Sequence, residues 1–149
     1  KGYKVISDEL KLPVLLISIK RINEITNAAE VTARLIETEA GKFFRLILAV
    51  DEEVDLNDYF MVAWYFMANS SPARDTHYIS DTSILIDGTN KAFSPTGFPR
   101  PWPDIVCSDE KTITDVDNKW RRCMPGEFIS SPSLKYKVLR RGNSANIGT

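Results

Sequence analysis

The stretch FFRLILAVDEEVDLNDYFMVAWYFMANSSPARDT, residues 43–76, decides the fold of this chain. Residues 43–50 are almost uniformly apolar, and five carboxylates follow between positions 51 and 58. A strand that is covered on both faces has such a continuous apolar run, and its carboxyl end emerges where the charges begin. Residues 59–69 are again apolar, with Asn57 or Asp58 as a helix N-cap before them and Pro72 as a stop behind them. The passage predicts a strand, an acidic turn and a helix, and it places the functional edge of an α/β sheet at the turn.

The residues before this stretch predict a second strand and a connecting helix. VLLISIK, residues 14–20, is a short run rich in β-branched residues that follows Pro13. Gly41 is a natural helix stop. Between the two strands, residues at helical spacing form one face of an amphipathic helix; they are Ile25, Ala28, Ala29, Thr32, Leu35 and Ile36. Strand, helix and strand within residues 14–50 form a βαβ unit, which implies parallel pairing and a right-handed crossover.

The rest of the chain is less regular. Residues 1–11 are a polar lead-in, residues 77–80 and 83–87 are short strand candidates, and residues 115–122 predict a third helix. Four prolines within residues 93–103 predict an irregular segment. We therefore expect an α/β domain over residues 1–124, with helices packed on a mixed, mostly parallel sheet.

From residue 125 onward the chain loses apolar density. Residues 125–149 carry Lys135, Lys137, Arg140 and Arg141 against Glu127 alone. We interpret this segment as a basic C-terminal arm, either disordered or ordered by a partner, and its apolar residues favour docking onto another subunit.

The composition excludes several classes of function. A net charge of −1 gives no global field that would attract nucleic acid or an anionic membrane. No run approaches the ~18 apolar residues of a membrane span, and the first residues contain no signal-peptide core. Cys107 and Cys123 lack the CxxC spacing of a zinc site, so we expect free thiols in a cytoplasmic protein, with a disulfide as the alternative.

Few residues carry an obvious catalytic or binding motif. His77 is the single histidine, and a half-buried structural role competes with a catalytic one. The alternating carboxylates 51, 53 and 55 resemble a cation loop, but Leu56 and Val62 stand where an EF-hand needs Gly and Glu. No glycine-rich phosphate loop occurs. The aromatic stripe of the second helix is expected to lie in the core, although two of its tyrosines could edge an interface; the stripe comprises Tyr59, Phe60, Trp64, Tyr65 and Phe66.

Several motifs in this order resemble one known family. RLILAVDEEVDL (45–56) is followed by Trp64, by SPARD (71–75), by DGTNK (87–91) and by NKW (118–120). The chain is similar to the C-terminal domain of the UbiD family, the decarboxylases and carboxylases that act on aromatic and α,β-unsaturated acids with prenylated flavin. The resemblance covers roughly residues 12–123, and Gly88 stands where the family usually has Ala.

The departures from the family pattern shape the expected function. Family enzymes hold prenylated FMN, its metal ion and the catalytic Arg and Glu residues in a large N-terminal domain, which has no counterpart here. Family enzymes also have a long loop that forms part of the wall of the substrate pocket. The corresponding segment here, residues 76–86, is short. The resemblance thus implies a non-catalytic small subunit of an aromatic acid (de)carboxylase complex, which binds no cofactor or metal itself and relies on a larger partner that holds prenylated FMN.

Two alternatives remain open. The chain could be a self-assembling homo-oligomeric scaffold or regulatory module, or a stand-alone lyase with a reduced pocket. Candidate catalytic residues for the lyase are Arg74, Asp75, Asp87 and Lys91, although an Arg–Asp pair that pins a turn is their first interpretation. The apolar face, the acidic turn and the arm would bind a partner, through candidate residues Asp51, Glu52, Glu53, Asp55, Tyr59, Tyr136, Arg140 and Arg141.

Overall fold

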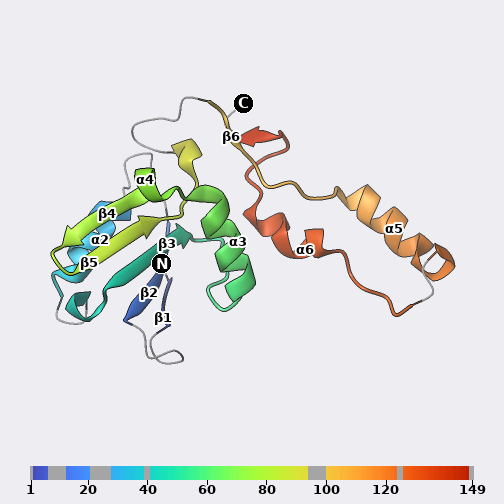
Figure 1. Cartoon of the computed structure of the whole chain (residues 1–149). Coiled ribbons are helices and arrows are strands. Elements are labelled where there is room, and N and C mark those ends of the chain that lie inside the picture. The colour runs from blue at the N-terminus through green and yellow to red at the C-terminus, as the bar shows by residue number, and fades with distance from the viewer. Residues whose placement is uncertain are drawn as a thin grey trace. The chain divides into compact units, whose positions relative to one another are not determined.

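In a computed structural model, the chain divides into two compact units, Lys1–Arg100 and Pro101–Thr149 (Figure 1). The structure describes residues 2–6, 13–20, 28–38, 41–93, 100–123 and 126–147. The expected helix start at Ile25 and most of the proline-rich segment lie outside these residues.

The first unit is built on a five-stranded sheet of order β1-β2-β3-β5-β4 (Figure 1). The strands are β1 (Gly2–Val5), β2 (Val14–Ile19), β3 (Leu46–Asp51), β4 (Thr76–Ser80) and β5 (Ser83–Asp87). The pairs β2–β3 and β3–β5 are parallel, and both outer pairs are antiparallel. The α/β class and the mixed sheet are confirmed, with the parallel strands at its centre.

Two of the sequence expectations for this unit were wrong in detail. Residues 2–5 form an edge strand rather than a polar lead-in. They are held as a strand by pairing with β2, and their own sequence contains no pattern that predicts one. Gly2 N–H donates to Ser18 Oγ at 2.9 Å at the end of this ladder. The strand expected to begin at residue 43 begins at Leu46, because Gly41–Phe43 form a 3₁₀ turn, η1.

The two faces of the sheet are covered by different helices. α2 (Ala28–Ile36) packs on the face where β2 and β3 contribute Ile17, Ile19 and Ile47 to the main core cluster. α3 (Tyr59–Asn69) lies on the opposite face, where its Val62 lines a groove with Leu48 of β3. Side chains of a strand alternate between faces, so the continuous apolar run of β3 serves both helices.

The boundaries of α3 are as expected. The Asp58 carboxylate accepts a hydrogen bond from the Met61 N–H at 3.1 Å and so caps the helix. α3 ends at Asn69, and Pro72 opens the short helix α4 (Pro72–Asp75), where its missing N–H costs no helical hydrogen bond. β4 and β5 follow as a hairpin, and a 3₁₀ turn, η2 (Lys91–Phe93), closes the segment.

The second unit contains β6 (Trp102–Pro103), α5 (Glu110–Cys123), α6 (Pro132–Tyr136), η3 (Lys137–Leu139) and β7 (Asn146–Ile147). β6 pairs with β7, so the end of the proline-rich segment is regular, contrary to expectation. α5 is longer than predicted, and it buries Ile113. Cys107 and Cys123 are free thiols.

A buried carboxylate ties the C-terminal arm to the start of this unit. Asp104 accepts hydrogen bonds from the backbone N–H groups of Ile105, Arg141 and Gly142 at 2.8–3.1 Å. Asp104 N–H donates in turn to the Ala145 carbonyl. Residues 141–145 are therefore held by residues 102–105 of the same unit.

Candidate functional site

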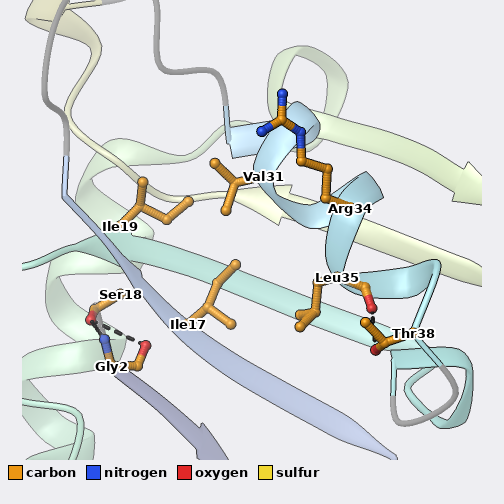
Figure 2. Close-up of a pocket in the computed structure, with 8 residues that line it drawn as sticks. All are labelled: Gly2, Ile17, Ser18, Ile19, Val31, Arg34, Leu35 and Thr38. Carbon is orange, nitrogen blue, oxygen red and sulfur yellow. Dashed lines mark hydrogen bonds between the residues drawn. The ribbon is translucent and has the colours of Figure 1, made fainter.

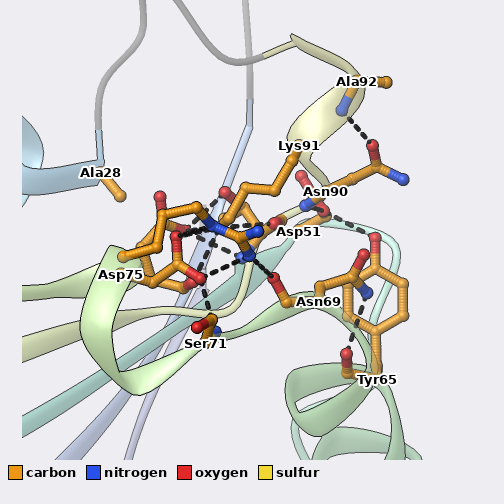
Figure 3. A network of polar contacts seen from close by, with 12 residues as sticks. Ala28, Asp51, Tyr65, Asn69, Ser71, Asp75, Asn90, Lys91 and Ala92 are labelled. Atoms are coloured by element: carbon orange, nitrogen blue, oxygen red, sulfur yellow. Dashed lines mark hydrogen bonds and ion pairs between the residues drawn. The ribbon is translucent and has the colours of Figure 1, made fainter. Parts of the chain in front are cut away.

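Polar side chains converge at the carboxyl ends of the central strands, the edge that the sequence marks as functional. Asp51 is the last residue of β3 and Asp87 is the last residue of β5. Figure 3 shows these ends joined to α3, α4 and the loop that leads into η2 by one network of polar contacts. We refer to this cluster as the edge network; its members are Asp51, Tyr65, Asn69, Ser71, Arg74, Asp75, Asp87, Thr89, Asn90 and Lys91.

Asp51 connects the strand to α3 and to the loop after β5. Its Oδ2 accepts from the Tyr65 hydroxyl at 2.6 Å and from the Asn90 N–H at 2.6 Å. The residue is 1% exposed, so it lies beneath the acidic turn rather than on the partner-binding rim that the sequence predicted. The reason is tertiary: two donors, 14 and 39 residues away in the chain, satisfy the carboxylate inside the protein.

Arg74 and Asp75 form a bidentate ion pair in α4. Arg74 Nε donates to Asp75 Oδ1 at 2.8 Å, and Arg74 Nη2 donates to Asp75 Oδ2 at 2.7 Å. Burial alone would raise the pKa of Asp75, but the hydrogen bonds from Arg74 and Ser71 and the charge of Lys91 hold it below its usual value. A carboxyl with a lowered folded-state pKa adds stability above its unfolded pKa, and this contribution is lost as the pH falls through the folded one.

Lys91 is a buried ammonium enclosed by oxygen atoms. Its Nζ donates to the carbonyls of Asp87 (2.7 Å) and Thr89 (2.8 Å), and it lies 3.3 Å from Asp87 Oδ1 and 3.6 Å from Asp75 Oδ1. The side chain is 5% exposed. Burial lowers the pKa of Lys91, although the carboxylates of Asp87 and Asp75 act in the opposite direction.

The structure thus brings together the four residues that the sequence offered as weak catalytic candidates. Asp75, Asp87 and Lys91 are joined through the Lys91 ammonium, and Arg74 is paired with Asp75. Sequence reasoning missed Tyr65 and Asn69, because an aromatic helix gives no signal that a hydroxyl and an amide point inward. Buried and mutually paired, these groups brace the ends of β3, β5 and α3, and their geometry fits the pinning role expected of an Arg–Asp pair.

Gly88 allows α3 to approach the end of β5. A Cβ at this position would lie 2.3 Å from Cδ2 of Phe66 and 3.0 Å from the Ala49 carbonyl oxygen. Gly88 N–H donates to that carbonyl at 2.9 Å, so the backbone at Gly88 cannot move away from Ala49 without breaking this hydrogen bond. An Ala at position 88 is therefore incompatible with the present position of the Phe66 ring.

We expect Gly88→Ala to lower the free energy of unfolding of the first unit by about 1–3 kcal/mol, because the added methyl group overpacks the contact with Phe66. The measurement is denaturant unfolding of the single variants Gly88→Ala and Phe66→Leu and of the double variant. The smaller, more adaptable leucine should recover part of the loss, which gives a coupling energy of ~1 kcal/mol. Strictly additive effects would contradict the contact.

The acidic turn and the outer side of α3 are the exposed parts of this edge. Glu52 and Asp55 are exposed and Glu53 is half-buried; Glu52 Oε1 lies 3.7 Å from Lys20 Nζ. Asp55 Oδ1 accepts from the backbone N–H of Asn57 at 2.9 Å. The turn is therefore structured by its own hydrogen bonds and presents carboxylates to solvent.

The expectation that the aromatic stripe of α3 lies in the core was wrong for most of its residues. Tyr65 is buried, but Phe60, Trp64 and Tyr59 are exposed, and Lys4 Nζ lies 4.3 Å from the centre of the Tyr59 ring. An all-apolar helix can bury only the side that meets the sheet, so its other side needs a further layer.

The remaining predicted site residues are not members of the edge network. His77 is half-buried in β4, opposite Leu85. Tyr136, Arg140 and Arg141 belong to the second unit. Tyr136 is half-buried, and Lys135 Nζ lies 5.6 Å from the centre of its ring.

Among the described residues, no group of three or more His, Cys, Asp or Glu side chains is arranged to hold a metal ion. In the part of the chain that the structure describes, no helix is long and apolar enough to cross a membrane.

Described residues line a pocket on either face of the sheet. One, of about 350 Å³, lies on the α2 side between apolar Ile17, Ile19 and Leu35, with Arg34 at its rim (Figure 2). Its hydroxyls are bonded to nearby backbone: Ser18 Oγ donates to the Gly2 carbonyl, and Thr38 Oγ1 donates to the Leu35 carbonyl. The second, of about 490 Å³, is an apolar groove on the α3 side. Neither pocket gathers the convergent polar groups that a specific cofactor site requires.

The fold is an α/β domain with a buried polar network at one edge of its sheet, and comparison with known proteins places it in a family. Residues 7–94 match the 3-octaprenyl-4-hydroxybenzoate carboxy-lyase C-terminal domain. The chain therefore belongs to this UbiD C-terminal domain family, as the motif order in its sequence predicts.

Individual relatives are more distant. An uncharacterized protein of Archaeoglobus fulgidus is 30% identical in an alignment 92 positions long, which covers 51% of this chain and 19% of that protein. Vanillic acid decarboxylase of Sedimentibacter hydroxybenzoicus (ShVdcCD) has a similar fold in its closed form, with a TM-score of 0.56 and 20% identity over 76% of this chain and 27% of that one. Its open form with truncated ShVdcD gives a TM-score of 0.53 and 19% identity over the same shares. The chain thus spans about a quarter or less of these proteins, and the structural likeness shows the fold.

Proposed function

We propose that this chain is the non-catalytic accessory part of a UbiD-type aromatic acid (de)carboxylase complex. It supplies assembly contacts and one wall of the active-site cleft, and a larger partner subunit holds prenylated FMN. The observation that carries the proposal is the state of the edge network: Lys91, Asp75 and Asp51 are buried and paired within the domain. Groups in this state brace a scaffold, whereas a catalytic acid or base must reach a substrate.

The exposed side of α3 supports the same function. Phe60 and Met67 are more than two-thirds exposed beside the carboxyl ends of the strands, where α/β proteins meet their ligands and partners. Aromatic and methionine side chains are enriched in protein interfaces. Vanillic acid decarboxylase, which was solved as ShVdcCD, contains a similar fold. A domain of this fold therefore occurs within a decarboxylase.

The test is co-expression with the product of a neighbouring reading frame that carries the larger flavin-binding domain. We expect the affinity-tagged chain to copurify with that larger subunit, and the complex to absorb light as a flavoprotein. The chain purified alone should be colourless and should take up no flavin. A flavin bound stoichiometrically by the isolated chain would contradict the proposal.

The exposed apolar side of α3 also favours a second candidate, a self-assembling scaffold. Light scattering on the pure chain separates the two, because a stable closed oligomer that ignores the larger subunit fits only the scaffold. A chain that remains monomeric until the larger subunit is added fits the accessory role.

A further inference from the structure

α3 carries three large apolar side chains in one exposed stripe. Phe60, Trp64 and Met67 follow the spacing i, i+4, i+7, and they are 70%, 40% and 76% exposed. We call these three residues the α3 stripe. A helix that is apolar on every side is normally enclosed on every side, so the exposed parts of these side chains indicate a further layer that the described residues of the first unit do not supply.

The groove beside the stripe extends the same apolar surface down to the sheet. It has a volume of about 490 Å³, and its walls include Leu48 of β3 and Val62, Ala63 and Phe66 of α3. Leu48 and its neighbour Ile86 in β5 are only half-buried. Central parallel strands are normally covered on both faces, and among the described residues of the first unit α3 is the helix that covers this face.

Acidic side chains outnumber basic ones at the end of this surface where α3 begins and where Lys4 lies over the Tyr59 ring. Glu52, Glu53 and Asp55 lie in the turn just before α3 begins, and Lys20 is the ion-pair partner of Glu52. At the other end of α3 the segment 70–73 carries no charge, and the next residue, Arg74, is paired with Asp75. A complementary surface therefore has apolar anchors with Lys or Arg side chains at one end only.

We infer that the α3 stripe and its groove are the docking site for an amphipathic helix of the larger, flavin-binding subunit. This inference rests on the proposed function and names the surface through which it operates. The 11 residues of α3 span about 16 Å, so a docked helix of about three turns would cover it. That helix places large apolar side chains on the stripe and Lys or Arg beside the acidic turn.

A second copy of this chain fits the surface less well. Two stripes packed in parallel would bring two acidic turns together, and like charges repel. Packed antiparallel, each acidic turn would face the end of the other α3, where Arg74 is committed to Asp75 and Asn69. The charge pattern therefore favours a partner with different residues over self-association.

The experiment measures binding of the purified larger subunit to the full chain by surface plasmon resonance. Phe60→Glu and Met67→Glu are expected to weaken binding on the order of 30-fold or more, because each buries a charge in an apolar contact. The matched control is Phe43→Glu, which alters a phenylalanine that is 61% exposed at the opposite end of β3 and should change the affinity less than about 3-fold. Glu52→Lys should slow association and weaken its salt dependence.

The outcomes separate this inference from the proposed function. If the wild-type chain binds the larger subunit and both stripe variants bind equally well, the docking site is wrong and the accessory role stands. If the wild-type chain does not bind at all, both fail. A wild-type homodimer that the stripe variants dissolve would show that a second copy covers the stripe, and it would overturn the inference.

Discussion

Replacement of Lys91 by methionine is expected to lower the free energy of unfolding of the first unit by about 3–5 kcal/mol, because it removes one partner of a buried ionic cluster. Methionine is close in size to lysine, so packing changes little. The carbonyls of Asp87 and Thr89 lose their donor, and the Asp87 carboxylate loses the cation 3.3 Å away. The measurement is denaturant unfolding followed by Trp64 fluorescence with Trp102 and Trp120 replaced by Phe, which leaves one tryptophan, in the first unit.

The matched control for this prediction is the double variant Lys91→Met, Asp87→Asn. A neutral amide needs no counter-ion, and its oxygen still accepts from the N–H and hydroxyl of Thr89, so ~1 kcal/mol should return. The pH dependence gives an independent check. The pKa of Lys91 is lowered from 10.5, so between its folded and unfolded values the unfolded chain binds more protons and stability rises with pH. The advantage of wild type over Lys91→Met should therefore widen across this window; equal stability at every pH would contradict the role of Lys91.

Replacement of Asp51 by alanine is the second change with a large expected effect, about 3 kcal/mol of unfolding free energy. The Tyr65 hydroxyl and the Asn90 N–H would both remain buried without their acceptor, and each unsatisfied donor costs roughly 1–3 kcal/mol. The same fluorescence-detected unfolding measures the loss. Asn90 should also exchange its amide hydrogen faster in the variant, because its N–H loses its partner.

A double-mutant cycle with Tyr65→Phe tests the physical reason. Once the hydroxyl is removed, Asp51→Ala leaves one donor unsatisfied instead of two, so its cost should fall by about 1 kcal/mol. Glu52→Ala, at the exposed neighbour, should change stability by less than ~0.5 kcal/mol. A loss in Glu52→Ala as large as that in Asp51→Ala would contradict the buried position of Asp51.

The edge network and the α3 stripe involve opposite sides of the same helix. The inner side of α3 contributes Tyr65 and Asn69 to the edge network, whereas its outer side carries Phe60 and Met67. Changes to the inner side should unfold the domain, and changes to the outer side should spare the fold and reduce binding. This division allows the two roles to be tested separately.

Local sequence signals determined the elements at the centre of the fold. The apolar runs of β2 and β3, the Asp58 cap and Pro72 depend on residues close together in the chain, so strand, turn and helix could be predicted from them. β1 could not, because its residues pair with residues of β2 that lie 10 to 16 positions away in the chain. The expectation of irregular structure at the end of the proline-rich segment failed for the same reason: Trp102–Pro103 becomes a strand only because residues 146–147 pair with it.

The sequence by itself determined the α/β class, the parallel βαβ centre, the family and the edge at which polar residues gather. Only the tertiary structure decided the state of those residues, since Asp51 is buried by donors 14 and 39 positions away, and Tyr59, Phe60 and Trp64 of the aromatic stripe are exposed whereas Tyr65 is buried. Periodicity tells which residues share a face of a helix or strand. Whether that face meets the sheet or solvent depends on contacts between distant segments, and an all-apolar helix such as α3 gives no periodic signal to choose between them.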